Sequence, residues 1–295
     1  MATNAYTYDN NARREDLMAL ITNLDFKETQ LVSGLADGDA ADIIHQWMTD
    51  TLDAVASNAK VEGADATMGD VTNPVRLTNY TQILSKPFQV SGSSRATNNA
   101  GFDDRMAYEA TKKMKAFKQD LELALLRGSL ACGTGSAARQ LKGIKNWLNL
   151  VTSQSGVSLT ETMFNDYLQN VWTQGVQVDA VYAPMYLKRK ISGFTAGATK
   201  QVDLVDRRLV NAVDVYQADA AQMVKLFPHR YVTISGDTNY DLVGIKESFF
   251  KKAWLRKPNT EPLAKNGDSD REQIIGEVTL ECYHQDAGFW TKALL

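Results

Sequence analysis

The sequence predicts an α+β fold in which one long helix lies on a sheet formed largely by the C-terminal part of the chain. Three observations support this prediction. Residues 103–127 have the apolar spacing of a single amphipathic helix, residues 240–258 and 272–294 are rich in strand-forming residues, and residues 150–243 alternate between helical and strand patterns. With 295 residues, 44% of them hydrophobic and 23% charged, the chain can bury a substantial core as one large domain or two modest ones.

The long helix is predicted from the stretch DDRMAYEATKKMKAFKQDLELALLRG. Its apolar residues recur at spacings of three and four, as on one face of an α-helix: Met106, Ala110, Met114, Phe117, Leu121 and Leu125. Asp103 and Asp104 are suited to its start, because a carboxylate can accept the free N–H groups of the first turn, and Gly128 is suited to its end. We expect a length of roughly 35 to 38 Å at 1.5 Å per residue.

An extended ribbon is predicted before this helix, in the stretch RLTNYTQILSKPFQVSGSSRA at residues 76–96. In an extended chain, apolar residues at even positions share one face and polar residues at odd positions share the other. The apolar face holds Tyr80, Leu84, Phe88 and Val90, and the polar face holds Asn79, Thr81, Ser85 and Gln89. A two-stranded ribbon with so small an apolar face is marginal in water, so we expect another surface to pack on it or to pair with its edges.

The first hundred residues are rich in Asn, Asp, Thr, Ser, Gly and Ala, which is typical of arms and loops. Within them, residues 40–59 are compatible with two structures. A helix would place Ile44, Trp47 and Met48 on one side, whereas a strand would place Trp47 and Met48 on opposite faces. Periodicity leaves both alternatives open.

A compact α/β unit is predicted between about residues 150 and 243. Helical patterns occur at 158–175 and 185–194, and an apolar strand occurs between them at 179–184. Residues 210–218 and 229–236 are further strand candidates. This part of the chain has enough apolar residues to form a core of its own.

No stretch of the sequence carries a catalytic or cofactor motif in a suitable context. GTGSAA at 133–138 resembles a glycine-rich dinucleotide loop, but it follows a predicted helix, and no acidic residue stands about 20 positions further on. DSDRE at 268–272 lacks the glycine and the glutamate of a calcium loop. The histidines, His45, His229 and His284, have no companions at metal-ligand spacing. We therefore expect a protein that is not an enzyme and that has no cofactor and no metal site.

Charge and cysteine content indicate which binding partners and which cellular compartment to expect. A net charge of -3 gives no reason to expect tight nucleic-acid binding, and the basic run FFKKAWLRK at 249–257 is interpreted as a strand with one solvated face. Cys132 and Cys282 are the only cysteines, which favours a reducing compartment. The sequence has no apolar signal-peptide core and no run of about 20 apolar residues, so we expect synthesis in the cytosol.

Six stretches, in this order, resemble the major capsid proteins of tailed bacteriophages. They are DFKETQLVSGL, HQWMTDTL, EGADAT, RLTNYTQILSKPFQVSG, KKMKAFKQDLELALLRG and LKGIKNWL, and the resemblance runs from about residue 25 to residue 283. It implies the Hong Kong 97-like capsid fold. It also implies an N-terminal arm at 1–60, an extended loop at 61–100, the spine helix of a peripheral domain at 101–145, an axial domain at 146–243, and the long sheet of the peripheral domain at 244–295.

The resemblance implies that many copies form the hexamers and pentamers of an icosahedral shell around double-stranded DNA, which they contact weakly and without sequence preference. Portal, scaffold and cement proteins are further expected partners, and no membrane is. The extended loop is expected to lie on the peripheral domain of a neighbouring subunit. Its expected contact residues are Arg76, Tyr80, Leu84, Lys86, Phe88 and Val90. We expect Leu84 and Phe88 to be buried only after assembly, so that replacing both with Asp would leave the fold of the subunit nearly intact and prevent assembly.

Three further expectations concern maturation, location and an alternative function. Because the chain begins almost at once with the arm, we expect no removal of a long N-terminal segment, and we expect no cross-link from Lys86. The resemblance implies location in the virion capsid, and in the host cytoplasm during assembly. The alternative is the shell protein of an encapsulin-like cellular compartment, which shares the fold and encloses protein cargo.

Overall fold

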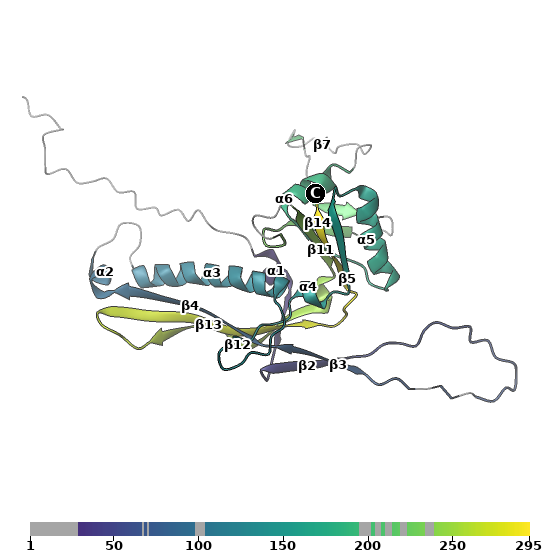
Figure 1. Ribbon diagram of the computed structural model, residues 1–295, viewed down its shortest axis with the longest axis horizontal. Coiled ribbons are helices and arrows are strands. Elements are labelled where there is room, and N and C mark those ends of the chain that lie inside the picture. The colour runs from purple at the N-terminus through teal and green to yellow at the C-terminus, as the bar shows by residue number, and fades with distance from the viewer. Residues whose placement is uncertain are drawn as a thin grey trace, which may run out of the picture.

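The computed structural model of the chain describes residues 29–194, apart from 67, 70 and 98–103, and then 202–203, 208–209, 214–218, 223–233 and 239–295. A long helix and two large sheets organise these residues (Figure 1). A four-stranded sheet runs along the helix, and a six-stranded sheet stands at the C-terminal end of the helix. The predicted α+β class is confirmed. Among the described residues, no helix is both long enough and apolar enough to cross a membrane.

The long helix, α3, spans Arg105–Arg127 and is unbroken, as predicted. At its start the Asp104 carboxylate accepts the backbone N–H of Met106, and Gly128 follows its last residue. Its 23 residues give a length of about 34 Å. One side of the helix is buried against the sheet: Met106, Phe117, Leu121, Leu125 and Leu126.

Two glycines allow the chain to return to the end of α3. A Cβ on Gly128 would lie 2.5 Å from the carbonyl oxygen of Leu141, and a Cβ on Gly143 would lie 2.5 Å from the backbone nitrogen of Gly128. Side chains larger than hydrogen cannot be placed at such distances. The loop 129–142 therefore closes back onto α3, and α4, Ile144–Trp147, packs beside it.

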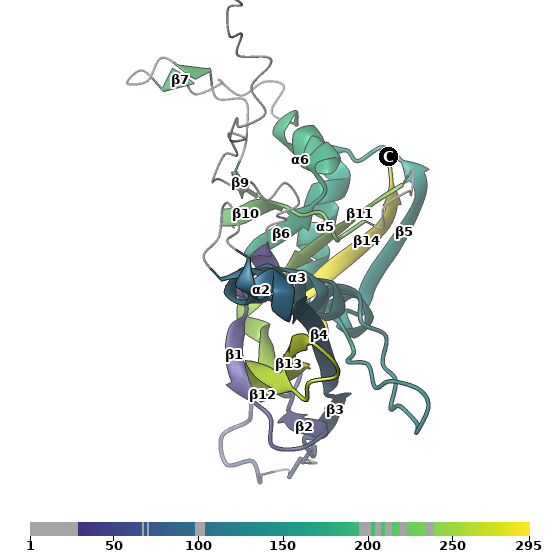
Figure 2. The ribbon, with the colours of Figure 1, turned by 90° about the vertical axis from the view of Figure 1, so that its left-hand side faces the viewer.

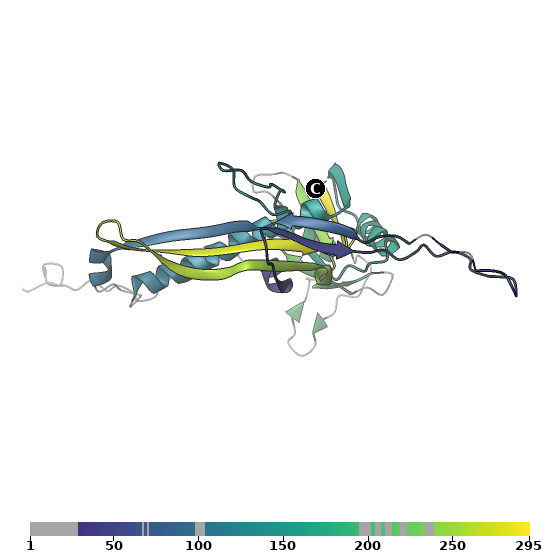
Figure 3. The same ribbon diagram turned by 90° about the horizontal axis from the view of Figure 1, so that it is seen from below.

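The four-stranded sheet has the strand order β1-β12-β13-β4. Its centre is the antiparallel pair β12, Phe250–Leu263, and β13, Ser269–Cys282. β4, Gln82–Ser91, pairs antiparallel with β13, and β1, Ala36–Asp39, pairs parallel with β12. Figure 3 shows these strands running along α3, and Figure 2 shows α3 as a layer over them. The predicted packing of the helix on the C-terminal strands is confirmed.

The six-stranded sheet has the strand order β5-β14-β11-β6-β10-β9. Its strands are β5, Leu150–Val157; β6, Ala180–Ala183; β9, Val215–Gln217; β10, Met223–Pro228; β11, Tyr240–Ile245; and β14, Gly288–Leu294. Two helices pack on it: α5, Glu161–Thr173, and α6, Met185–Ser192. Shorter elements are α2, Gly92–Ala96; the 3-10 helix η2, Glu247–Phe249; and the paired β7, Val202–Asp203, and β8, Arg208–Leu209.

Two strand predictions in this region are wrong. The candidate strand at 229–236 is irregular over its described part, 229–233, and the strand β10 ends earlier, at Pro228. Proline has no N–H to donate to a ladder, which suits the end of a strand. In addition, β14 pairs with β5 and β11 in the six-stranded sheet, so the C-terminal strand does not join the sheet under α3.

The predicted ribbon at 76–96 is divided between two sheets. β3, Val75–Tyr80, pairs with β2, Ile44–Thr49, which settles the structure of that segment as extended. After Thr81 the chain enters β4, which pairs with β13 along its whole length. The ribbon that projects from the body therefore consists of β2, β3 and their connection, residues 44–80 (Figure 1).

Candidate assembly interface

The β2–β3 ribbon extends away from the body at the end opposite to α2 (Figure 1). Its antiparallel register places Ile44 opposite Tyr80 and Met48 opposite Arg76. Residues directly opposite each other share a face, so these four side chains lie on one face of the ribbon. Ile44 and Met48 are exposed, which identifies this face as the open one.

Among the described residues, the most fully exposed large apolar side chains lie on this ribbon and its connection. The side chain of Leu52 is 98% exposed, and that of Val71 is 90% exposed. Others in the same segment are Ile44, Met48, Val55, Val61, Met68 and Val75. Apolar side chains that one segment leaves exposed in this way mark a candidate interaction surface.

Asn79 fixes the base of the ribbon to the body. Its Nδ2 donates to the carbonyl oxygens of Leu280, at 2.7 Å, and Lys142, at 3.1 Å. Its Oδ1 accepts the backbone N–H groups of Lys142, at 2.8 Å, and Tyr80, at 2.9 Å. The side chain is fully buried, and its donors and acceptor are all used, so the ribbon leaves β13 and the loop 129–142 in one defined direction.

A buried carboxylate forms a second anchor at the ribbon base. Oε1 of Glu277, on β13, accepts the hydroxyl of Thr81 at 2.6 Å and also binds the Arg139 guanidinium. Its Oε2 accepts Nε of Arg256 at 3.1 Å, and Nε of Arg139 donates to the carbonyl oxygen of Thr81 at 3.1 Å. Two cations and a hydroxyl therefore satisfy a carboxylate that is almost inaccessible to water.

The inner face of the ribbon packs on the end of β13. Nε1 of Trp47 donates to the carbonyl oxygen of Cys282 at 2.9 Å, and Nε2 of His45 lies 2.7 Å from Oε1 of Glu281. The Trp47 ring lies 5.5 Å from the Trp147 ring, centroid to centroid. These contacts hold β2 against the body while its opposite face remains open.

Burial at this contact shifts the pKa values of two groups. Burial raises the pKa of the Cys282 thiol to about 12, because the thiolate would be poorly solvated there. Burial, together with the hydrogen bond to Glu281, raises the pKa of the Tyr283 hydroxyl to about 12. Both groups therefore stay neutral at the ribbon base at physiological pH.

The structure separates the six predicted contact residues into two groups. Arg76 and Tyr80 lie on the open face of the ribbon. Leu84, Phe88 and Val90 are buried within their own subunit, with exposed fractions of 9%, 7% and 4%. The expectation that Leu84 and Phe88 remain exposed until assembly is therefore wrong.

The reason for this error is that β4 is a strand of the subunit's own sheet. Leu84, Phe88 and Val90 lie on its face toward α3, where the helix supplies the apolar surface that the sequence pattern demanded. Lys86 shares this face, and its Nζ lies 2.5 Å from Oδ2 of Asp120 on α3. The apolar face of β4 is covered by another surface, as expected, but that surface is α3 of the same chain.

The arm enters the body through a short helix that is held at both ends by buried charges. This helix, α1, spans Gln30–Gly34. The carboxylate of Glu122, on α3, accepts the backbone N–H groups of Leu31, at 2.9 Å, and Val32, at 2.7 Å. Nζ of Lys252, on β12, donates to the carbonyl oxygens of Val32, at 2.6 Å, and Leu35, at 2.7 Å. The anion and the cation thus match the polarity of the helix ends.

His229 joins the six-stranded sheet to the same junction. Its Nε2 lies 2.6 Å from Oε1 of Glu122, and its Nδ1 accepts the backbone N–H of Tyr231 at 3.2 Å. Because Nδ1 accepts a hydrogen bond, the ring proton is on Nε2 and is donated to Glu122. The arm, the long helix and the second sheet therefore meet at one buried carboxylate.

Sequence reasoning missed these buried polar residues because it treated charges as solvated. Lys252 shares one strand face with Phe250 and Trp254, so a charge on an otherwise apolar face was the available signal there. Glu122 lies about 100° around the helix from Leu121, outside the apolar stripe, and no sequence signal marked it. The loop GTGSAA, in contrast, lies between the bridged residues Ala131 and Gln140 and does not connect a strand to a helix.

Comparison with known proteins identifies related sequences. Residues 1–294 match the family described as SU10 major capsid protein. The chain is also 36% identical, over 123 residues, to the major capsid protein of Escherichia phage Phieco32. That alignment covers 41% of the chain and spans about a third, 35%, of the length of the relative.

Solved structures share the fold at low sequence identity. The capsid of a native GTA particle matches with a TM-score of 0.67 and 11% identity over 100% of both chains. The capsid of Myoviridae phage XM1 matches with a TM-score of 0.62 and 10% identity over 95% of this chain and 97% of that one. The SrpI encapsulin of Synechococcus elongatus PCC 7942 matches with a TM-score of 0.61 and 11% identity over 100% and 96%. The Hong Kong 97-like fold expected from the sequence is confirmed.

Proposed function

Because this chain belongs to the SU10 major capsid protein family, we propose that it serves as the major capsid protein of a tailed bacteriophage. Many copies form the hexamers and pentamers of an icosahedral shell that encloses packaged double-stranded DNA. In this role the chain is a structural protein rather than an enzyme. Its place is the virion, and the host cytoplasm during assembly.

The observation that carries this proposal is the β2–β3 ribbon. Its base is fixed by Asn79 and Glu277, whereas its open face and its connection expose apolar side chains such as Leu52 and Val55. Exposed apolar side chains lower the solubility of a subunit unless a partner covers them. A ribbon that is held in one direction presents these side chains to a partner in a defined orientation. A neighbouring copy of the same chain is the partner that shell assembly supplies at every position.

The contact set follows from the open face. We assign the ribbon contact to residues 44–80, including Arg76 and Tyr80, and place it on the peripheral domain of a neighbouring subunit. The peripheral domain consists of α3 with the four-stranded sheet, and the axial domain consists of the six-stranded sheet with α5 and α6. Portal, scaffold and cement proteins are the further partners of such a shell.

An encapsulin-like compartment is the second candidate, since an encapsulin has the same fold. The family match along residues 1–294 favours the phage protein. The contents of purified particles separate the two functions, because a phage head contains DNA and a cellular compartment contains protein cargo.

Electron microscopy of the chain expressed alone tests the proposal. We expect closed shells, or tubes with the same hexamer lattice, at micromolar protein concentration. A chain that remains monomeric across salt and pH conditions, including in the presence of its phage's scaffold protein, contradicts the proposed function.

A further inference from the structure

Among the described residues, α3 covers one face of the four-stranded sheet and no helix lies along the other, which we call the far face. Figure 3 looks onto the far face and shows its strands in front of α3. The strand registers place alternate residues on this face. They include Ile83, Ser85, Pro87 and Gln89 of β4, Arg271, Gln273 and Ile275 of β13, and Leu263 of β12.

The far face is partly apolar. The side chains of Ile83 and Leu263 are 47% and 37% exposed, and Ile275 is half-buried on the central strand. A pocket of about 390 Å³ lies near the β12–β13 turn and is lined by Pro87, Phe88, Gln89, Leu263 and Arg271. Exposed apolar side chains beside a hollow favour contact with another surface.

Arg271 supplies the cation of this pocket. Its Nε is buried and has no hydrogen-bond partner among the described residues. Asp270, the preceding residue, lies on the face toward α3 and is bound by Arg95 and Lys265. Because a buried N–H without an acceptor is costly, a carboxylate from outside the subunit is a favourable partner for Arg271.

The carboxylates of the far face are already bound. Arginines bind Glu277, and Nε2 of His45 lies 2.7 Å from Oε1 of Glu281. Oε2 of Glu261 accepts Nε2 of Gln273 at 3.4 Å. The cations of the same face are Lys251, Arg256 and Arg271. This charge pattern favours an acidic partner.

The connection of the ribbon, residues 50–74, has the complementary character. It contains five carboxylates and one lysine, for a net charge of -4. Its apolar side chains Leu52 and Val55 are almost fully exposed. About 12 residues, half of the connection, span about 40 Å when extended, which is close to the roughly 46 Å of the 14-residue strands β12 and β13.

We propose that the ribbon connection of a neighbouring copy binds the far face, and that Arg271 pairs there with Asp50 or Asp53 of that copy. This inference rests on the proposed function and names the acceptor surface of its ribbon contact. The apolar side chains of the connection cover the exposed Ile83 and Leu263. The charge pair fixes the direction in which the ribbon lies.

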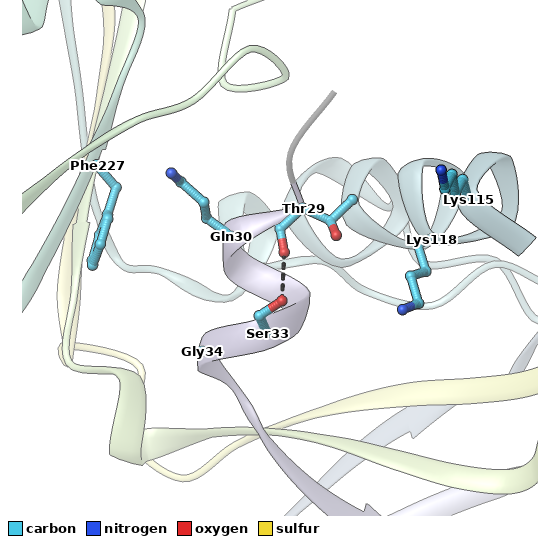
Figure 4. Close-up of a pocket in the computed structure, with 7 residues that line it drawn as sticks. All are labelled: Thr29, Gln30, Ser33, Gly34, Lys115, Lys118 and Phe227. Atoms are coloured by element: carbon cyan, nitrogen blue, oxygen red, sulfur yellow. Dashed lines mark hydrogen bonds between the residues drawn. The ribbon is translucent and has the colours of Figure 1, made fainter. Parts of the chain in front are cut away.

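A pocket beside α1, of about 660 Å³, is the competing acceptor (Figure 4). It is lined by Lys115 and Lys118 of α3, by residues 29, 30, 33 and 34, and by Phe227. Lys115 already has an interaction partner within its own chain. Among the described residues that line this pocket, Phe227 is the only large apolar one, so it offers less apolar surface to the ribbon than the far face does.

Charge reversal tests the pairing. Arg271→Glu places a like charge against the ribbon, so we expect the subunit concentration needed for shells to rise about tenfold or more. Asp50→Lys/Asp53→Lys is expected to have the same effect, and the combination of all three changes is expected to restore the parental concentration. Sedimentation and electron microscopy measure assembly, and urea unfolding of unassembled subunits shows that each variant is folded.

The matched control is Lys118→Glu, which makes the same charge change at an exposed lysine of the competing pocket. We expect it to assemble as the parent does. Parental assembly of Arg271→Glu, or a defect that Asp50→Lys/Asp53→Lys does not relieve, overturns the pairing. A defect in Lys118→Glu that the ribbon reversal relieves overturns it as well, and moves the acceptor to the pocket beside α1.

A cross-link tests the same contact without charge reversal. Arg271→Lys keeps the charge and is expected to form shells. In these shells a zero-length carbodiimide should join the amine introduced at position 271 to Asp50 or Asp53 of a neighbouring copy, and mass spectrometry identifies the joined peptides. Shells that lack this product, or that join the ribbon carboxylates to Lys118, contradict the assignment.

The proposed function is tested separately by the parent protein. Parental shells, together with normal assembly of Arg271→Glu and no cross-link at position 271, overturn the acceptor surface alone. A parent that forms no shells contradicts the proposed function and, with it, this inference.

Discussion

Nε2 of His229, directly after β10, lies 2.6 Å from Oε1 of Glu122, in the C-terminal part of α3. Both side chains are buried, and the same carboxylate also accepts two backbone N–H groups of α1. Three segments that are distant in sequence thus depend on one acceptor. The relative positions of α1, α3 and the six-stranded sheet are fixed at this contact.

We predict that Glu122→Gln destabilises the subunit by about 2 to 4 kcal/mol, because an amide NH2 group would face donors that now bind a carboxylate. Urea unfolding of unassembled subunits measures the change. Glu109→Gln is the matched control on the same helix, since Glu109 forms only a long contact with Lys112. It is expected to change the free energy of unfolding by less than about 0.5 kcal/mol. Equal effects of the two variants would show that the junction is not a stabilising contact.

The ribbon base leads to a second prediction. Thr81→Val keeps the shape of the side chain but removes the hydroxyl that donates to Glu277 at 2.6 Å. We expect a loss of about 1 to 2 kcal/mol in the same unfolding measurement, because a buried carboxylate loses one of its donors. Thr51→Val, at an exposed position in the ribbon connection, serves as the control and is expected to leave stability unchanged. The idea fails if the two threonine variants cannot be distinguished.

The shifted pKa of Cys282 predicts a pH dependence of stability. Burial raises the pKa of this thiol from its ordinary value of 9.0 to about 12, so the unfolded chain loses the proton first as pH rises. The contribution of the protonated Cys282 thiol to the free energy of unfolding is fully present below pH 9, and it is lost between pH 9 and 12. Over this range the free energy of unfolding should fall with pH in both proteins, but less steeply in Cys282→Ala than in the parent. The two slopes should differ by up to about 1.4 kcal/mol per pH unit. Parallel stability curves for the two proteins would contradict the burial of the thiol.

The sequence allowed the long helix, its start at Asp104 and its packing on the C-terminal strands to be predicted, because these depend on local periodicity and capping. Strand pairing was harder. β4 and β3 have similar patterns, yet one pairs with β13 and the other with β2, since pairing is decided by long-range register that a local pattern does not encode. Glu122 and Lys252 were missed for a related reason: their partners are backbone groups of α1, and no side-chain motif reveals them.

The corrected position of β4 reverses the expected effect of mutating it. Leu84→Asp/Phe88→Asp is predicted to unfold the subunit, because each side chain is buried under α3 and each loss costs about 3 to 5 kcal/mol. Circular dichroism and thermal unfolding measure the effect. Leu84→Met/Phe88→Leu, which keeps the apolar character, is the control and should fold. A stable, folded Asp variant would mean that β4 does not belong to the core.

The central claim is that the ribbon of residues 44–80 is the assembly contact. The variant Leu52→Asp/Val55→Asp changes two side chains that are almost fully exposed in the subunit, so its stability should match that of the parent. In the shell the same changes place charges in a desolvated contact, at about 2 to 4 kcal/mol for each subunit pair. Leu52→Met/Val55→Ile keeps the contact apolar and is expected to assemble.

Analytical ultracentrifugation of these variants, with electron microscopy of the same samples, tests this claim most directly. We expect folded, unassembled subunits for Leu52→Asp/Val55→Asp and normal shells for Leu52→Met/Val55→Ile. Normal shells from the Asp variant would contradict the claim, because the ribbon would then have no role in the contact between subunits.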